Sequence, residues 1–211
     1  MITGLRSVSF ENLVLNEGAF IMGLKPSTYN TYTALVEAIE AELGATSTNI
    51  LGATSGGGTF VCAPETRTIE IDGLRGLLKG ASQIDSWDVR LTGTLKEIRP
   101  EVFAKLCIGG TVDSTIAGVK KITVHSDIKN DDYIADMCWV GSTSKGMMLI
   151  HLTNVLNTVG VTMTFQDKGE ATVPFEFVAH NENATGDANI PCDIYFLEEP
   201  ESGNGGSGTG N

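Results

Sequence analysis

The amino-acid sequence predicts a mainly β protein, a β-sandwich or barrel with one flanking α-helix, in a single domain over residues 1–200. Two observations carry this prediction. Runs of alternating apolar and polar residues recur between Gly, Pro and Asp turn signals, whereas only one long segment has helical periodicity. A length of 211 residues with 41% apolar residues also suits one domain with a buried core. About eight short strands are typical of a sandwich or barrel.

The N-terminal segment is predicted to be an arm followed by a strand. Residues 1–6 form the arm, and they lack the basic and apolar regions of a secretory signal. Val8, Phe10, Leu13 and Leu15 then alternate with polar residues, as expected of a half-buried strand.

Residues 32–43 have the periodicity of an amphipathic α-helix. Asn30 or Thr31 caps its start and Gly44 ends it. The apolar residues of the predicted buried face are Tyr32, Leu35, Val36, Ile39 and Leu43. Glu37 and Glu40 lie on the opposite, solvated face, so the helix is expected to cover one sheet or one mouth of a barrel.

Residues 45–58 are predicted to form a long loop. The segment is rich in Gly, Ser and Thr and has no amphipathic period. Gly56, Gly57 and Gly58 do not form a phosphate cradle, because no Lys-Ser or Lys-Thr pair follows at P-loop spacing.

The next elements are predicted strands at 59–62, 66–71 and 86–98. The first pair is followed by Asp72-Gly73, a strong turn signal. The third has the clearest alternation, with Trp87 on the face expected to be buried.

The second half of the chain continues this pattern. Pro100 begins a short helix. Further strands are predicted at 121–128, 147–153, 159–165, 172–180 and 193–198. Pro174 implies an edge position or a bulge. Residues 201–211 hold five glycines and no apolar side chain, and are expected to form a flexible tail.

No constellation of catalytic, cofactor-binding or metal-ligating residues emerges, so we expect no enzyme, no cofactor and no metal. The cysteines are Cys62, Cys107, Cys138 and Cys192, with no CxxC pair among them, and they are interpreted as reduced, buried thiols. The histidines are His125, His151 and His180, each within or at the end of a predicted strand. No Gly-x-Ser-x-Gly elbow accompanies them, and the aspartates between 127 and 132 lack EF-hand spacing.

The net charge of −12 excludes further classes of function. Acidic residues are concentrated beyond Asp167, where Lys168 is the only basic residue. Such a chain repels the phosphate backbone, so nucleic-acid binding is disfavoured. Two interpretations stay open: a solvated acidic face, or carboxylates lining a surface past which nucleic acid slides. The apolar run at 147–150 is far too short to span a bilayer, and no membrane partner is expected.

Two ordered sets of motifs resemble the major tail proteins of long-tailed bacteriophages of Gram-positive hosts. The first set is GGGTF at 56–60, PETR at 64–67, IEIDGLRG at 69–76, KG at 79–80, DSWDVRL at 85–91 and TGTLKE at 92–97. The second is WVG at 139–141, GMMLI at 146–150, FQDK at 165–168, and VPF at 173–175 with His180. Together they cover most of the chain.

The resemblance implies a structural virion protein with the fold of tail tube proteins, assembled in the host cytoplasm. Six copies form a ring, rings stack into a hollow tube, and phage DNA passes through the lumen during ejection without specific binding. Residues 1–6, the loop 45–58 and the C-terminal tail are the expected inter-subunit arms. The other implied partners are the tape measure and terminator proteins of the tail.

Two alternatives stay open. A tube subunit of a contractile tail or of a phage-tail-like bacteriocin shares the fold and differs chiefly in its partners. A β-sandwich virion adhesin or carbohydrate-binding module belongs to a different class and needs exposed aromatic platforms, for which Trp87 and Trp139 are the only tryptophans available.

Overall fold

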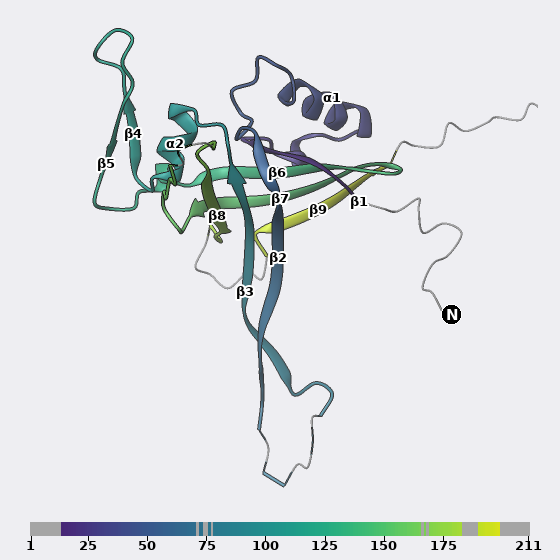
Figure 1. The fold of residues 1–211 in the computed structure, drawn as a ribbon. Coiled ribbons are helices and arrows are strands. Elements are labelled where there is room, and N and C mark those ends of the chain that lie inside the picture. Colours follow the sequence, from purple (N-terminus) through teal and green to yellow (C-terminus); the bar gives the residue numbers. More distant parts are fainter. Residues whose placement is uncertain are drawn as a thin grey trace, which may run out of the picture.

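The computed structural model describes residues 14–198 apart from 71, 74–75, 77, 166, 168 and 183–189 (Figure 1). The described elements are β1 (Val14–Met22), the 3-10 turn η2 (Pro26–Thr28), α1 (Tyr32–Glu42), β2 (Thr54–Thr68), β3 (Ser82–Leu95), α2 (Pro100–Leu106), β4 (Gly110–Asp113), β5 (Lys121–Val124), η3 (Asn130–Asp132), β6 (Ile134–Thr143), β7 (Gly146–Asn157), β8 (Val173–Ala179) and β9 (Cys192–Glu198). The prediction of a mainly β fold is therefore confirmed. Among the described residues, no helix is long and apolar enough to cross a membrane.

One antiparallel sheet organises the body of the molecule. Its strands follow the order β1-β6-β7-β8-β3-β2. Strand β7 is central, because β6 lies along one edge while β9 and β8 share the other, β9 at residues 146–152 and β8 at 155–157. No sheet of the described residues closes on itself. A closed barrel is therefore not present within the described part of the chain.

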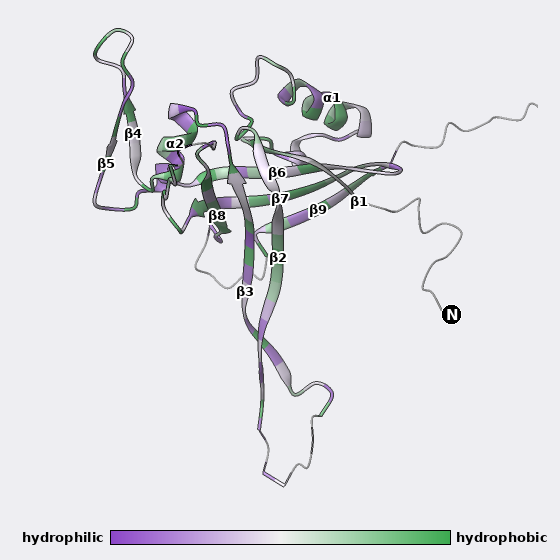
Figure 2. Ribbon diagram, viewed as in Figure 1, coloured by the Kyte–Doolittle hydropathy of each residue, from purple (hydrophilic) through white to green (hydrophobic). Residues whose placement is uncertain are grey.

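The sheet separates two apolar clusters, because successive residues of a strand point to opposite faces. On one face, Leu35 and Ile39 of α1 pack with Ile21 of β1, Cys138 of β6 and Leu149 of β7. The opposite face carries the larger cluster, which the strands β3 and β8 and helix α2 cover. Most residues of β7 are buried, in agreement with its hydrophobic colouring in Figure 2.

The helix predictions are confirmed at both positions. The Thr31 side chain accepts a hydrogen bond from the backbone N–H of Ala34 at 3.2 Å and so caps α1. Pro100 stands in the first turn of α2, where its missing N–H costs no helical hydrogen bond. The body thus has a second short helix besides the flanking one.

Three sequence predictions need correction. The loop expected at 45–58 ends earlier, because β2 begins at Thr54 and includes the three glycines. The predicted strands 59–62 and 66–71 are one strand, which passes through Pro64 because β2 is an edge strand and needs no N–H donor there. Residues 159–165 form no strand beyond a single bridge at Thr164.

Other predicted features lie outside the described residues. These are the N-terminal arm 1–6, the first half of the predicted opening strand at 8–13, and the C-terminal tail 201–211. Of the strands predicted in the second half, β8 and β9 are confirmed at 173–179 and 192–198. Pro174 does lie at a local edge, because β8 pairs with β7 only from Phe177 onward.

Candidate interaction surface

The feature that stands out from the body is a projecting hairpin arm. Strands β2 and β3 pair from Thr54↔Leu95 to Thr68↔Ser82, but only the base of this hairpin packs on the core. Every residue at 62–70 and 82–87 is exposed. We call these two segments the arm, and Figure 1 shows it leaving the body on the side away from α1.

A bulge in β3 determines which residues share a face of the arm. Pro64 lies opposite Trp87, and Thr66 lies opposite Ile84, whereas the register shifts by one residue between Glu65 and Thr66. Pro64 and Thr66 are two residues apart on β2, so Trp87 and Ile84 point to the same side although they are three apart. Without the bulge, Ile84 would point to the other face.

The apolar face of the arm continues the core out into solvent. At its base Val89 and Leu91 are buried in the body, at 1% and 2% exposure. Further out on the same face, Trp87 is 39% and Ile84 53% exposed. The expectation that Trp87 is buried is therefore wrong: its face was predicted correctly, but the body ends before reaching it. An uncovered apolar stripe of this kind is typical of an interaction site.

On the opposite face of the arm, polar side chains of β2 and β3 form hydrogen bonds with one another. The Arg67 Nε donates to Asp85 Oδ1 at 2.7 Å, and the Arg67 Nη2 donates to Gln83 Oε1 at 2.9 Å. The Ser86 hydroxyl donates to Glu65 Oε2 at 2.7 Å. Asp85 is the extra residue of the bulge, and its ion pair with Arg67 links the bulge to β2.

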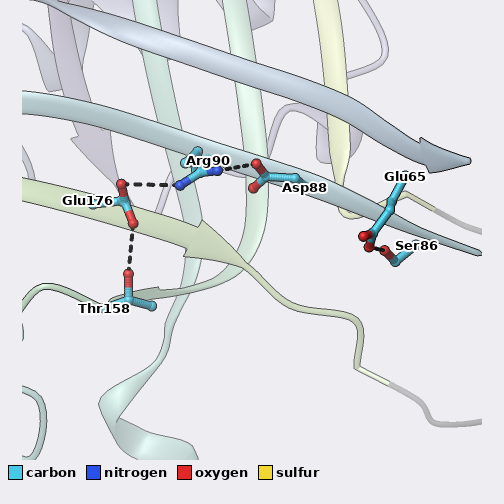
Figure 3. A network of polar contacts seen from close by, with 6 residues as sticks. All are labelled: Glu65, Ser86, Asp88, Arg90, Thr158 and Glu176. Atoms are coloured by element: carbon cyan, nitrogen blue, oxygen red, sulfur yellow. Dashed lines mark hydrogen bonds and ion pairs between the residues drawn. The ribbon is translucent and has the colours of Figure 1, made fainter.

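These polar contacts extend toward the body along the same face, as Figure 3 shows. Arg90 pairs with Asp88 and, at 3.4 Å, with Glu176 of β8. Glu176 also accepts a hydrogen bond from the Thr158 hydroxyl at 3.1 Å. Asp88 is the main cause that raises the pKa of Arg90 above its ordinary value. The base of the arm is thus tied to β8 as well as to the core.

Three strands lie at edges of the sheet. Among the described residues, β2 pairs only with β3, and β9 pairs only with β7. Strand β1 pairs only with β6, apart from the bridge Ile21↔Ile50 near its end. Ile194 and Phe196 of β9 are also 46% and 67% exposed. Free strand edges with apolar side chains are templates for pairing with another chain.

One cavity of the described residues is lined without any acidic or basic side chain. A cavity of about 700 Å³ lies between β2 and the strands β1, β6 and β7. Its lining consists of Gly18, Phe20, Thr54, Gly56, Gly57, Gly58, Thr59, Phe60, Leu91, Trp139 and Ile150. This wall consists of aromatic and aliphatic side chains, glycines and two threonines. It could hold an apolar group, but it supplies no general acid or general base with a pKa near neutrality.

The three histidines have separate partners. His151 is 3% exposed, and its Nε2 lies 2.8 Å from Asp136 Oδ1 while its Nδ1 lies 3.7 Å from Asp193 Oδ2. His125 and His180 contact the backbone carbonyls of Asp127 and Asn154 through Nδ1. No group of three or more metal-ligating side chains occurs within the described part of the chain.

The cysteines are free thiols, but not all are buried. Burial raises the pKa of Cys138 far above its ordinary value, and its thiol donates to the Leu24 carbonyl. Burial, with a smaller contribution from Cys62, raises the pKa of Cys192 to about 12. Cys62 itself is exposed at the base of the arm, so the expectation that it is buried is wrong.

The acidic residues beyond Asp167 are partly neutralised by ion pairs. Glu170 pairs with Lys96, and Glu176 pairs with Arg90. These two carboxylates therefore belong to local ion pairs of the body.

No protein-family model matches the chain, and no curated protein gives a significant match.

Proposed function

We propose that this chain is a tail tube protein, a non-enzymatic virion subunit that assembles into hexameric rings and then into a hollow tube for DNA ejection. The observation that carries the proposal is the arm, with an apolar face that none of the described residues of its own body covers. An element of this kind loses its exposed apolar surface only by contacting another molecule. The ordered motif set at 56–97 includes most of β2 and β3 and so coincides with the hairpin that bears the arm.

The open sheet supports the same proposal. An unclosed sheet with free edges at β2 and β9 is a liability in an isolated chain. In a ring with cyclic symmetry, each edge meets the neighbouring copy, and the strands join into a closed barrel around a channel. The sandwich or barrel expected from the sequence is therefore proposed to be a property of the assembled ring.

The same proposal defines the partners. The chain associates chiefly with copies of itself, within a ring and between stacked rings, and with the tape measure and terminator proteins at the ends of the tail. DNA passes through the lumen without specific binding, since the net charge of −12 opposes adhesion to phosphate. The virion tail is the proposed location.

Negative-stain electron microscopy of the purified protein tests this proposal. We expect six-fold rings or tubes with an open channel, formed above a threshold concentration. Analytical ultracentrifugation over the same concentration range measures the threshold independently. A monomer that persists across concentration and salt would contradict the proposal.

A further inference from the structure

A second hairpin, separate from the arm, also projects from the body. Strands β4 and β5 pair from Gly110↔Val124 to Asp113↔Lys121 as a separate two-stranded sheet (Figure 1). Its base is fixed on α2, because a Cβ at Gly110 would lie 2.4 Å from the Ala104 carbonyl oxygen. Ile116 and Val119 of the connecting turn are 66% and 48% exposed.

The turn of this hairpin is basic as well as apolar. Lys120 and Lys121 follow Val119 directly, in a chain with a net charge of −12. Lys120 pairs with Glu101, and Lys121 is exposed. Asp113 lies opposite Lys121 and offsets part of its charge, while its carboxylate also accepts hydrogen bonds from Thr115. The hairpin therefore presents apolar side chains beside at least one exposed ammonium group.

Helix α1 carries acidic side chains, which complement the basic side chain of the hairpin. Glu37 and Glu40 are exposed on its outer face, and no Lys or Arg occurs from residue 26 to residue 66. Leu43 directly follows α1 on the side that faces the sheet, where it is 42% exposed and lines a hollow with Val140 and Met147. An exposed apolar side chain at the end of the helix therefore lies beside the carboxylates of its outer face, as a partner for the hairpin requires.

The β4–β5 hairpin and helix α1 lie at different ends of the body, as Figure 1 shows. A contact between complementary surfaces at two ends of one molecule is heterologous, and repeated around a rotation axis it closes a ring. We propose that the β4–β5 hairpin of one copy docks on α1 of the next copy in the ring. Lys121 then faces Glu37 and Glu40, while Ile116 and Val119 cover Leu43. This inference rests on the proposed ring assembly and names the contact that closes it.

Photo-crosslinking tests the contact directly. Benzoylphenylalanine replaces Ile116 in the full chain, and this variant is mixed with isotope-labelled wild-type protein before irradiation. Mass spectrometry is expected to find cross-links to residues 32–43 of a different copy. The same probe at Ile69, on the arm, serves as the control and is expected to map elsewhere. Cross-links from Ile116 only to other segments would overturn the inference.

Charge reversal gives a second test. Lys121→Glu and Glu40→Lys are each expected to raise the critical concentration for assembly by roughly 3- to 10-fold, since each places like charges across the contact. The double variant restores the attraction and is expected to assemble almost as well as wild type. Lys25→Glu makes the same change of net charge away from the hairpin and serves as the control.

The outcomes separate the two proposals. If wild-type protein assembles into rings but Lys121→Glu behaves like Lys25→Glu, the hairpin contact is wrong and the tube proposal stands. A wild-type protein that never associates overturns both.

Discussion

Trp139 of β6 lies against two glycines of its own sheet. Gly18 and Gly141 are register partners on β1 and β6, and a Cβ added to either would clash with the indole ring, at 2.6 Å and 2.1 Å. The missing side chains let the ring lean across both strands and cover their backbone. Since Phe20, Trp139 and Ile150 line the same cavity, this packing shapes the face that β2 crosses.

Gly141→Ala is therefore expected to destabilise the fold. The new methyl group forces Trp139 out of its position, and overpacking of this kind typically costs about 1–3 kcal/mol. Urea unfolding followed by tryptophan fluorescence measures the change in the free energy of unfolding. Gly76→Ala is the matched control, because nothing lies within 4 Å of a Cβ there, and its effect should stay within about 0.5 kcal/mol. Equal unfolding midpoints for the two variants would show that Trp139 adapts freely.

The burial of His151 and its two carboxylate neighbours could not be predicted from the sequence. Strand histidines are usually surface or partly packed residues, and the sequence gives no reason to treat this one differently. In the structure it is buried between Asp136 and Asp193, which lie 15 and 42 positions away along the chain. Those partners meet it only because β6 and β9 flank β7, and that topology has no local signal.

The elements differ in how well their sequences predict them. The prediction of helix α1 is nearly correct, because the periodicity of its residues and its Thr31 cap are features of the local sequence. Strand β6 was not predicted, since it is covered on both faces and therefore lacks alternation between apolar and polar residues. Strand β7 was predicted to stop at Thr153, but Asn154 adopts a positive φ of 48° and the strand continues to Asn157.

The arm was only half predictable for a related reason. The turn at Asp72-Gly73 and the alternation around Trp87 indicate a hairpin with one apolar side. Alternation reports which side chains share a face, but not whether another element covers that face. The bulge at Asp85 also has no sequence signature, because it depends on the register between β2 and β3.

The apolar face of the arm leads to a prediction at the element scale. Ile84→Thr combined with Trp87→Thr is expected to leave the body folded, since both side chains lie beyond the buried base of the hairpin. Assembly should weaken at least about tenfold in critical concentration, because the face that we propose to contact the neighbouring copy becomes polar. Sedimentation velocity measures assembly, and circular dichroism checks folding.

Gln83→Thr provides the matched control on the opposite, polar face of the arm, where it removes the hydrogen bond from Arg67. It should assemble within about threefold of wild type. Equal loss of assembly in both variants would indicate that rigidity of the arm matters more than its apolar face.

At the scale of the whole molecule, the distribution of charge determines which partners are attracted or repelled more than the net charge does. The chain carries −12, yet two of the described carboxylates beyond Asp167, Glu170 and Glu176, pair with Lys96 and Arg90 of the body. The basic pair Lys120-Lys121 lies instead on the β4–β5 hairpin, at the end of the body away from α1 (Figure 1). A molecule with this layout repels polyanions in general while keeping a basic contact for an acidic partner.

This layout predicts how the protein treats DNA. Wild-type protein, as subunits or as tubes, is expected not to retard double-stranded DNA in gel-shift assays even at about 50 mM salt, where phosphate contacts are strong. Retardation that falls steeply with salt would contradict the proposed passive lumen. The variant Lys120→Glu with Lys121→Glu then identifies the source: loss of retardation would make the hairpin a nucleic-acid site, whereas unchanged retardation would point to another surface. Because neither lysine is buried, folding of this variant is expected to be unaffected.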